Sequence, residues 1–146
     1  MREIIFRGKR KDNGEWVEGY YGEYYNGKKN ISCISIPSKE AVSGSLCYDI
    51  IPETVGQYTG LTDKNGTKIF EGDILKIIDG KEIIIASVKF GDYNQPDKIL
   101  KTHIGFYFDI ANLVSYRKDI GYWFGKTFSE IEVIGNVHDN PELLQD

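Results

Sequence analysis

Short runs of apolar and aromatic residues, each followed by glycine or polar turn residues, repeat along most of the chain. The pattern predicts strands at residues 3–8 and 15–21 joined by a turn at Asn13-Gly14, and a second hairpin around Asn26-Gly27. Asn-Gly is a strong hairpin signal because both residues tolerate positive φ. Several short strands joined in this way indicate antiparallel pairing, since parallel strands need long crossovers.

A further hairpin is predicted at Asp79-Gly80, with residue 78 opposite 81, 77 opposite 82 and 75 opposite 84. In this register one face, the expected core, holds Leu75, Ile77, Ile84, Ala86, Val88 and Phe90. The opposite face holds Ile74, Ile78, Ile83 and Ile85. That is too much aliphatic surface to leave bare, so residues 1–50 or a second chain should cover it.

The later part of the chain has weaker signals. Residues 91–102 are polar and predict an exposed loop, followed by a strand at 103–108. Apolar spacing predicts a helix from 109 to 118 with Asp109 as its N-cap. A last strand is expected at 131–137, and Asn140-Pro141-Glu142 has the residue order of a helix start.

Together these elements predict a mainly β fold with a minor α component, in two subdomains. The first is a β-rich part over residues 1–50. The second, over residues 51–146, is expected to form an SH3-like barrel with a short helix. The barrel assignment rests on pattern and implies no function.

Composition places the chain among ordinary globular proteins, with 40% hydrophobic and 27% charged residues in 146. The net charge is -4, and the sequence lacks the overall basic footprint of a nucleic-acid binder. Ten tyrosines favour β surfaces that make contacts.

Location and redox state follow from two further features. The longest apolar run, residues 83–88, is too short for a membrane span, and charges occupy the N-terminus where a secretory signal needs apolar residues. We therefore expect a cytoplasmic protein with no membrane partner. Cys33 and Cys47 are expected to be free thiols, with a disulfide as the less favoured alternative, and are too few for a zinc site.

Motifs for catalysis or cofactor binding are missing from the sequence. Glu71 and Asp73, with Asp63 and Glu53 nearby, lack the alternating spacing of a calcium loop. Asp73 is instead expected to bond its own turn, and Glu71 to be solvated. Neither a nucleophile elbow nor a glycine-rich phosphate loop occurs. We predict no catalytic residues, no metal and no cofactor.

One constellation could bind single-stranded nucleic acid, through base stacking on aromatic rings along a positive groove. It comprises Arg7, Lys9, Arg10, Trp16, Tyr20 and Tyr24. Acidic residues interleave with it and would repel phosphate, so the favoured interpretation is that these aromatics belong partly to the core and the basic residues to a solvated turn.

Three segments resemble the YopX family: FRGK with GEWVEGY (6–9 and 14–20), ETVGQYTGLTDKNGTKIFEGDIL (53–75) and EVIGNVHDNPELL (132–144). The resemblance implies a phage or prophage origin and a two-part, mainly β fold, and it supplies no reaction. The residues expected to shape the central motif are Gly60, Asp63, Gly66, Glu71, Gly72 and Asp73. We predict a non-catalytic accessory protein that acts through a protein partner or self-association, with nucleic-acid binding as the alternative.

Overall fold

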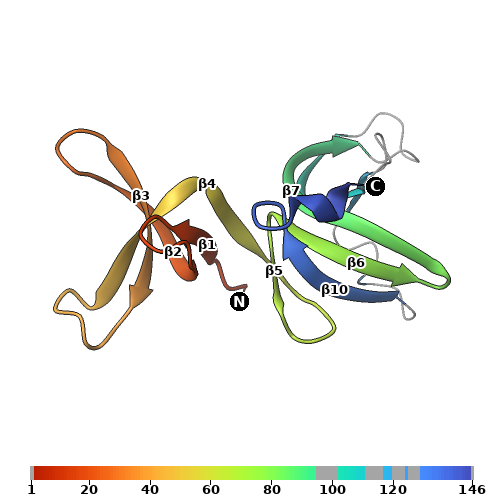
Figure 1. The fold of residues 1–146 in the computed structure, drawn as a ribbon, viewed down its shortest axis with the longest axis horizontal. Coiled ribbons are helices and arrows are strands. Elements are labelled where there is room, and N and C mark those ends of the chain that lie inside the picture. Colours follow the sequence, from red (N-terminus) through yellow and green to blue (C-terminus); the bar gives the residue numbers. More distant parts are fainter. Residues whose placement is uncertain (1, 95–101, 111–116, 120–123, 125–128, 146) are drawn as a thin grey trace. The chain divides into compact units, whose positions relative to one another are not determined.

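The computed structural model describes residues 2–94, 102–110, 117–119, 124 and 129–145. Within these residues almost all regular structure is strand, arranged in two antiparallel sheets with one short 3₁₀ helix (Figure 1). The mainly β class predicted from the sequence is confirmed. The chain divides into two compact units, residues 1–60 and 61–146, and β4 (Ser45–Thr62) runs through residue 50, where the sequence analysis placed the division.

In the first unit, strand pairing runs in a circuit through β1 (Phe6–Arg10), β2 (Trp16–Tyr25), β3 (Asn30–Pro37) and β4. The first part of β2 pairs with β1 and its second part with β3. Likewise β4 pairs first with β3 and then with β1. Ile34 and Ile50 are fully buried within this circuit.

Both predicted Asn-Gly turns of this unit are confirmed. Gly14 has φ +73° and Gly27 has φ +92°. The Asn26 side-chain oxygen accepts the backbone N–H groups of Lys28 and Lys29 at 2.9 and 3.0 Å. Such local bonds stabilise the turn before any long-range contact forms.

The second unit contains a sheet of strand order β10-β6-β7-β8-β9. Its strands are β6 (Asp73–Asp79), β7 (Glu82–Asn94), β8 (Thr102–Ile110), β9 (Arg117–Asp119) and β10 (Ser129–Asn136). The short β5 (Lys68–Phe70) pairs instead with β4. Buried residues of the core are Ile69, Leu75, Ile77, Ala86, Val88, Phe108, Ile110 and Ile131. Closure of this unit into an SH3-like barrel stays a prediction.

The β6–β7 hairpin has the predicted faces but a different register. Ile78 lies opposite Ile83 and Asp79 opposite Glu82, so the loop is Gly80-Lys81 and the predicted register is wrong. The correction shifts every partner by two residues, which preserves the face of each side chain because strands alternate with a period of two. On the expected core face Leu75, Ile77, Ala86 and Val88 are buried. Ile84 is half-buried, and Phe90 is 52% exposed. On the other face Ile83 is 65% exposed in the single chain.

Two predictions for the later part of the chain are wrong. Residues 91–94, expected in a loop, continue β7. The helix predicted from 109 to 118 is contradicted at both ends. Asp109 belongs to β8, where it pairs with Ser87 of β7, and Arg117 belongs to β9. Pairing with a neighbouring strand satisfies the backbone here and overrides a weak helical pattern. Residues 95–101 and 111–116 lie outside the described residues.

The C-terminal predictions are confirmed. The last strand is β10, and the 3₁₀ helix η1 (Pro141–Leu144) begins at Pro141 with Asn140 in the N-cap position.

Candidate functional site

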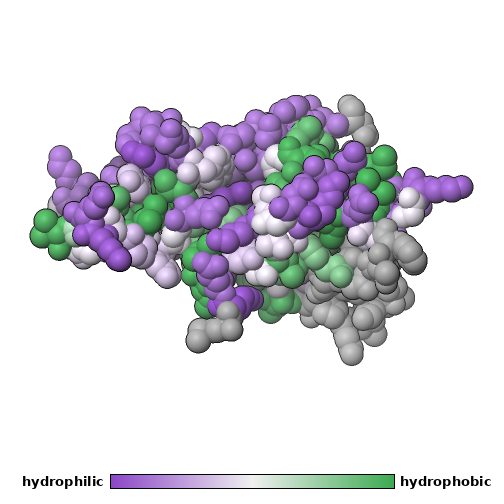
Figure 2. Space-filling model, turned by 90° about the horizontal axis from the view of Figure 1, so that it is seen from below, coloured by the Kyte–Doolittle hydropathy of each residue, from purple (hydrophilic) through white to green (hydrophobic). Residues whose placement is uncertain are grey.

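Strand β2 exposes four tyrosines, Tyr20 and Tyr24 on one side of the strand and Tyr21 and Tyr25 on the other, and we call the four together the tyrosine surface. Their exposed fractions are 57%, 39%, 43% and 67%. Because side chains alternate along a strand, Tyr20 and Tyr24 share one side of β2 with Trp16. On the face shown in Figure 2, hydrophobic residues appear as small separate areas among hydrophilic ones. Exposed tyrosines are amphipathic, so they can contact a partner through the ring and through the hydroxyl.

Two of the predicted binding residues, Arg7 and Lys9, lie next to Trp16 at the start of β2. In the β1–β2 register Lys9 lies opposite Trp16 and Arg7 opposite Glu18. The Arg7 guanidinium carbon is 4.9 Å from the centre of a Trp16 ring, and the Lys9 amine is 5.9 Å away. These are cation–π distances, so two cations of the chain itself already approach the indole that a nucleic-acid base would use.

Arg10 does not join this group. It lies on the other side of β1 from Lys9, with its guanidinium carbon 4.2 Å from the centre of the Tyr48 ring. Its Nε donates to Asp12 at 2.9 Å. This hydrogen bond raises the pKa of Arg10 and lowers the pKa of Asp12. Arg10 thus lies apart from Arg7 and Lys9, because alternate residues of a strand face opposite ways.

Tyr24 reaches across the sheet. Its hydroxyl donates to Asp49 at 2.9 Å, although Tyr24 is on β2 and Asp49 on β4, with β3 between them. The bond to Asp49, followed by burial, raises the pKa of Tyr24. Asp49 was not among the site residues predicted from the sequence. Only the registers of the β2–β3 and β3–β4 hairpins, taken together, place it within reach of Tyr24.

Asp63, a residue of the predicted structural motif, connects two distant segments of the chain by hydrogen bonds. Its carboxylate accepts backbone N–H groups of Asn65 and Thr67 at 2.9 Å, and of Val133 in β10 at 3.0 Å. Burial by itself would raise the pKa of Asp63, but the N–H donors outweigh it and lower the pKa. Asp63 therefore ties the turn to the last strand, across 70 positions of sequence.

The other motif residues shape the neighbouring turn. Asp73 is buried and accepts the Phe70 N–H at 2.8 Å, which confirms that it bonds its own turn. Gly72, at φ +90°, donates to the Val88 carbonyl and accepts from the Val137 N–H, each at 2.8 Å. Gly60 and Gly66 also have positive φ, +88° and +80°. Glu71, expected to be solvated, is half-buried.

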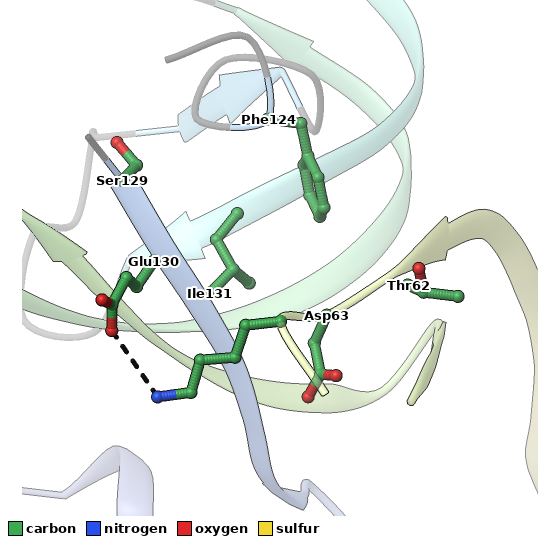
Figure 3. Close-up of a pocket in the computed structure, with 7 residues that line it drawn as sticks. Thr62, Asp63, Phe124, Ser129, Glu130 and Ile131 are labelled. Carbon is green, nitrogen blue, oxygen red and sulfur yellow. Dashed lines mark ion pairs between the residues drawn. The ribbon is translucent and has the colours of Figure 1, made fainter. Parts of the chain in front are cut away.

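A cavity of about 240 Å³ lies in the second unit. It is lined by Thr62, Asp63, Lys64, Phe124, Ser129, Glu130 and Ile131 (Figure 3). The Lys64 amine lies 3.6 Å from Glu130 and 3.5 Å from Glu132. The Asp63 carboxylate is bonded to backbone donors, and the Lys64 amine lies near the carboxylates of Glu130 and Glu132.

Among the residues that the structure describes, no cluster of three His, Cys, Asp or Glu side chains is arranged to hold a metal ion. None of the helices described is long and apolar enough to cross a membrane. The exposed His138 belongs to the turn after β10, where its N–H donates to Asn136 Oδ1 at 3.0 Å.

The fold is that of a two-unit antiparallel β protein. Its central motif, residues 53–75, forms turns and hydrogen-bonds to the last strand. The family model described as YopX protein matches residues 5–145, and the chain belongs to this family. The structure is similar to protein EF1440 from Enterococcus faecalis, with a TM-score of 0.53 and 23% identity over 99% of this chain and 100% of that one. This likeness shows the fold alone. A comparison with curated proteins gave no match.

Proposed function

We propose that this protein is a non-catalytic accessory protein of phage or prophage origin, acting in the bacterial cytoplasm by binding another protein through the tyrosine surface. The observation that carries the proposal is the exposure of four tyrosines along one strand. Tyrosine is enriched at protein interfaces, because its ring offers large apolar area and its hydroxyl a hydrogen bond.

Charge around the surface also favours a protein partner. Glu18 and Glu23 are exposed on the same strand, and Asp49 holds the Tyr24 hydroxyl. Carboxylates at these positions oppose a phosphate backbone but are compatible with the polar rim of a protein interface.

Single-stranded nucleic-acid binding is the second candidate, and the observation that favours it is the approach of Arg7 and Lys9 to Trp16. It predicts binding to oligo(dT) or RNA that weakens steeply with salt, because phosphate contacts release counterions. Fluorescence anisotropy at low salt measures this directly. Absence of binding removes this candidate and leaves the first one standing.

A photo-crosslinking amino acid in place of Tyr20 tests the proposal in cells that contain the phage or prophage. We expect an adduct with a protein, lost on protease treatment and kept on nuclease treatment. The same amino acid at Val42, a fully exposed residue outside the tyrosine surface, is the matched control. Equal adducts at both positions, or an adduct at position 20 that only nuclease removes, would overturn the proposal.

A further inference from the structure

The two cysteines lie on neighbouring strands of the first unit. Cys33 is on β3 opposite Asp49, and Cys47 is on β4 opposite Ser35. Residues 33 and 35 share one face, so Cys33 and Cys47 are a diagonal pair on the same face of the sheet.

The hydrogen-bond pattern shows which ladder positions the two cysteines occupy. The Ser38 N–H donates to the Gly44 carbonyl at 2.9 Å, in the same register as the β3–β4 ladder. Counting along the ladder, Cys33–Asp49 and Ser35–Cys47 are two successive non-hydrogen-bonded pairs, and the cysteines are diagonal neighbours across them.

The two thiols differ in access. Cys47 is exposed, whereas Cys33 is buried. The Tyr24–Asp49 hydrogen bond spans β3, the strand that carries Cys33. Burial and then a hydrogen bond with the Cys47 thiol raise the pKa of Cys33 to about 11. Cys33 therefore stays a thiol at neutral pH, while Cys47 meets solvent.

We propose that Cys47 and Cys33 form a redox-modification site, which a low-molecular-weight disulfide such as oxidised glutathione converts to an internal disulfide. The Cys47 thiolate attacks one sulfur of the oxidant, forming a mixed disulfide and releasing one reduced thiol. Cys33 then loses its proton to solvent and attacks the Cys47 sulfur, which releases the second reduced thiol. The protein loses two hydrogens and two electrons, and one oxidant disulfide is reduced to two thiols.

The test is intact mass spectrometry of the folded, full-length protein after incubation with oxidised glutathione. Wild type should lose two hydrogens and retain no glutathione. Cys33→Ser should stop at the mixed disulfide on Cys47. Cys47→Ser should stay unmodified while folded and react only after denaturation, because its remaining thiol is buried.

The wild-type protein alone is enough to test the proposal, even if a variant fails to fold. A wild-type product that keeps glutathione on Cys47 would show that Cys33 cannot reach it. A wild-type protein that reacts only after denaturation would show that Cys47 is inaccessible. Either result overturns the proposal, and neither bears on the proposed protein-binding role.

Discussion

At the scale of single residues, the aspartates of the central motif hold the backbone of their turns. Asp63 and Asp73 both use their carboxylates to hold backbone N–H groups. A buried carboxylate is costly unless it is hydrogen-bonded, and Asp63 has three backbone donors from two distant segments. The carboxylates of Asp63 and Asp73 are thereby engaged by the backbone of their own turns and, for Asp63, of the last strand.

Replacing Asp63 by Ala should lower the free energy of unfolding by about 3 kcal/mol, because backbone donors at a buried position lose their charged acceptor. Urea denaturation followed by circular dichroism measures this. Glu53→Ala, a change at an exposed acid, is the matched control and should stay within about 0.5 kcal/mol of wild type. Equal stability of both variants would contradict the assigned role.

The same carboxylate should make stability depend on pH. The pKa of Asp63 is lower in the folded protein than its ordinary value of 3.8. Its contribution is therefore fully present above pH 3.8 and is lost as the pH falls through the folded pKa. Comparing wild type with Asp63→Asn, we expect a constant stability difference from neutral pH to about pH 5 and a shrinking one in acid. A difference that instead grows in acid would exclude this linkage.

At the scale of elements, the decisive feature of the first unit is that β2 changes partner from β1 to β3 between Gly19 and Tyr20. A Cβ added at Gly19 would lie 2.4 Å from the Ser35 carbonyl oxygen and 3.1 Å from an Ile34 methyl carbon. Only glycine allows this approach, so one residue lets a single strand serve two pairings.

Gly19→Ala should therefore destabilise the protein by about 1–3 kcal/mol through overpacking against backbone. Gly22→Ala on the same strand is the matched control, since a Cβ there meets nothing within 4 Å. We expect its free energy of unfolding to match wild type or exceed it slightly, because alanine loses less backbone entropy on folding. If thermal or urea unfolding ranks the two variants the other way, the close approach at Gly19 is not limiting.

At the scale of the whole molecule, each unit has its own buried residues: Ile34 and Ile50 in the first, Leu75, Ile77 and Phe108 in the second. Cooperative unfolding units usually coincide with such cores. The chain passes from one unit to the next within β4.

We expect urea unfolding to show two transitions, with Gly19→Ala shifting one and Asp63→Ala the other. Hydrogen exchange measured by mass spectrometry can assign each transition to residues 1–60 or 61–146. A single transition shifted by both variants would show that the two cores unfold as one cooperative unit.

The sequence by itself determined the antiparallel β class, both Asn-Gly turns of the first unit, the core face of the β6–β7 hairpin and the helix start at Pro141. These follow from local causes: positive φ at glycine, the two-residue period of a strand, and the fixed φ of proline.

Only the tertiary structure decided the rest. The loop at Gly80-Lys81 and the strand at Asp109 depend on which backbone groups a neighbouring strand satisfies. The Tyr24–Asp49 bond joins residues of different hairpins, and Cys33 and Cys47 are neighbours only in the register of the β3–β4 hairpin. No local pattern encodes such contacts, since strand register fixes them, and register is set by long-range packing.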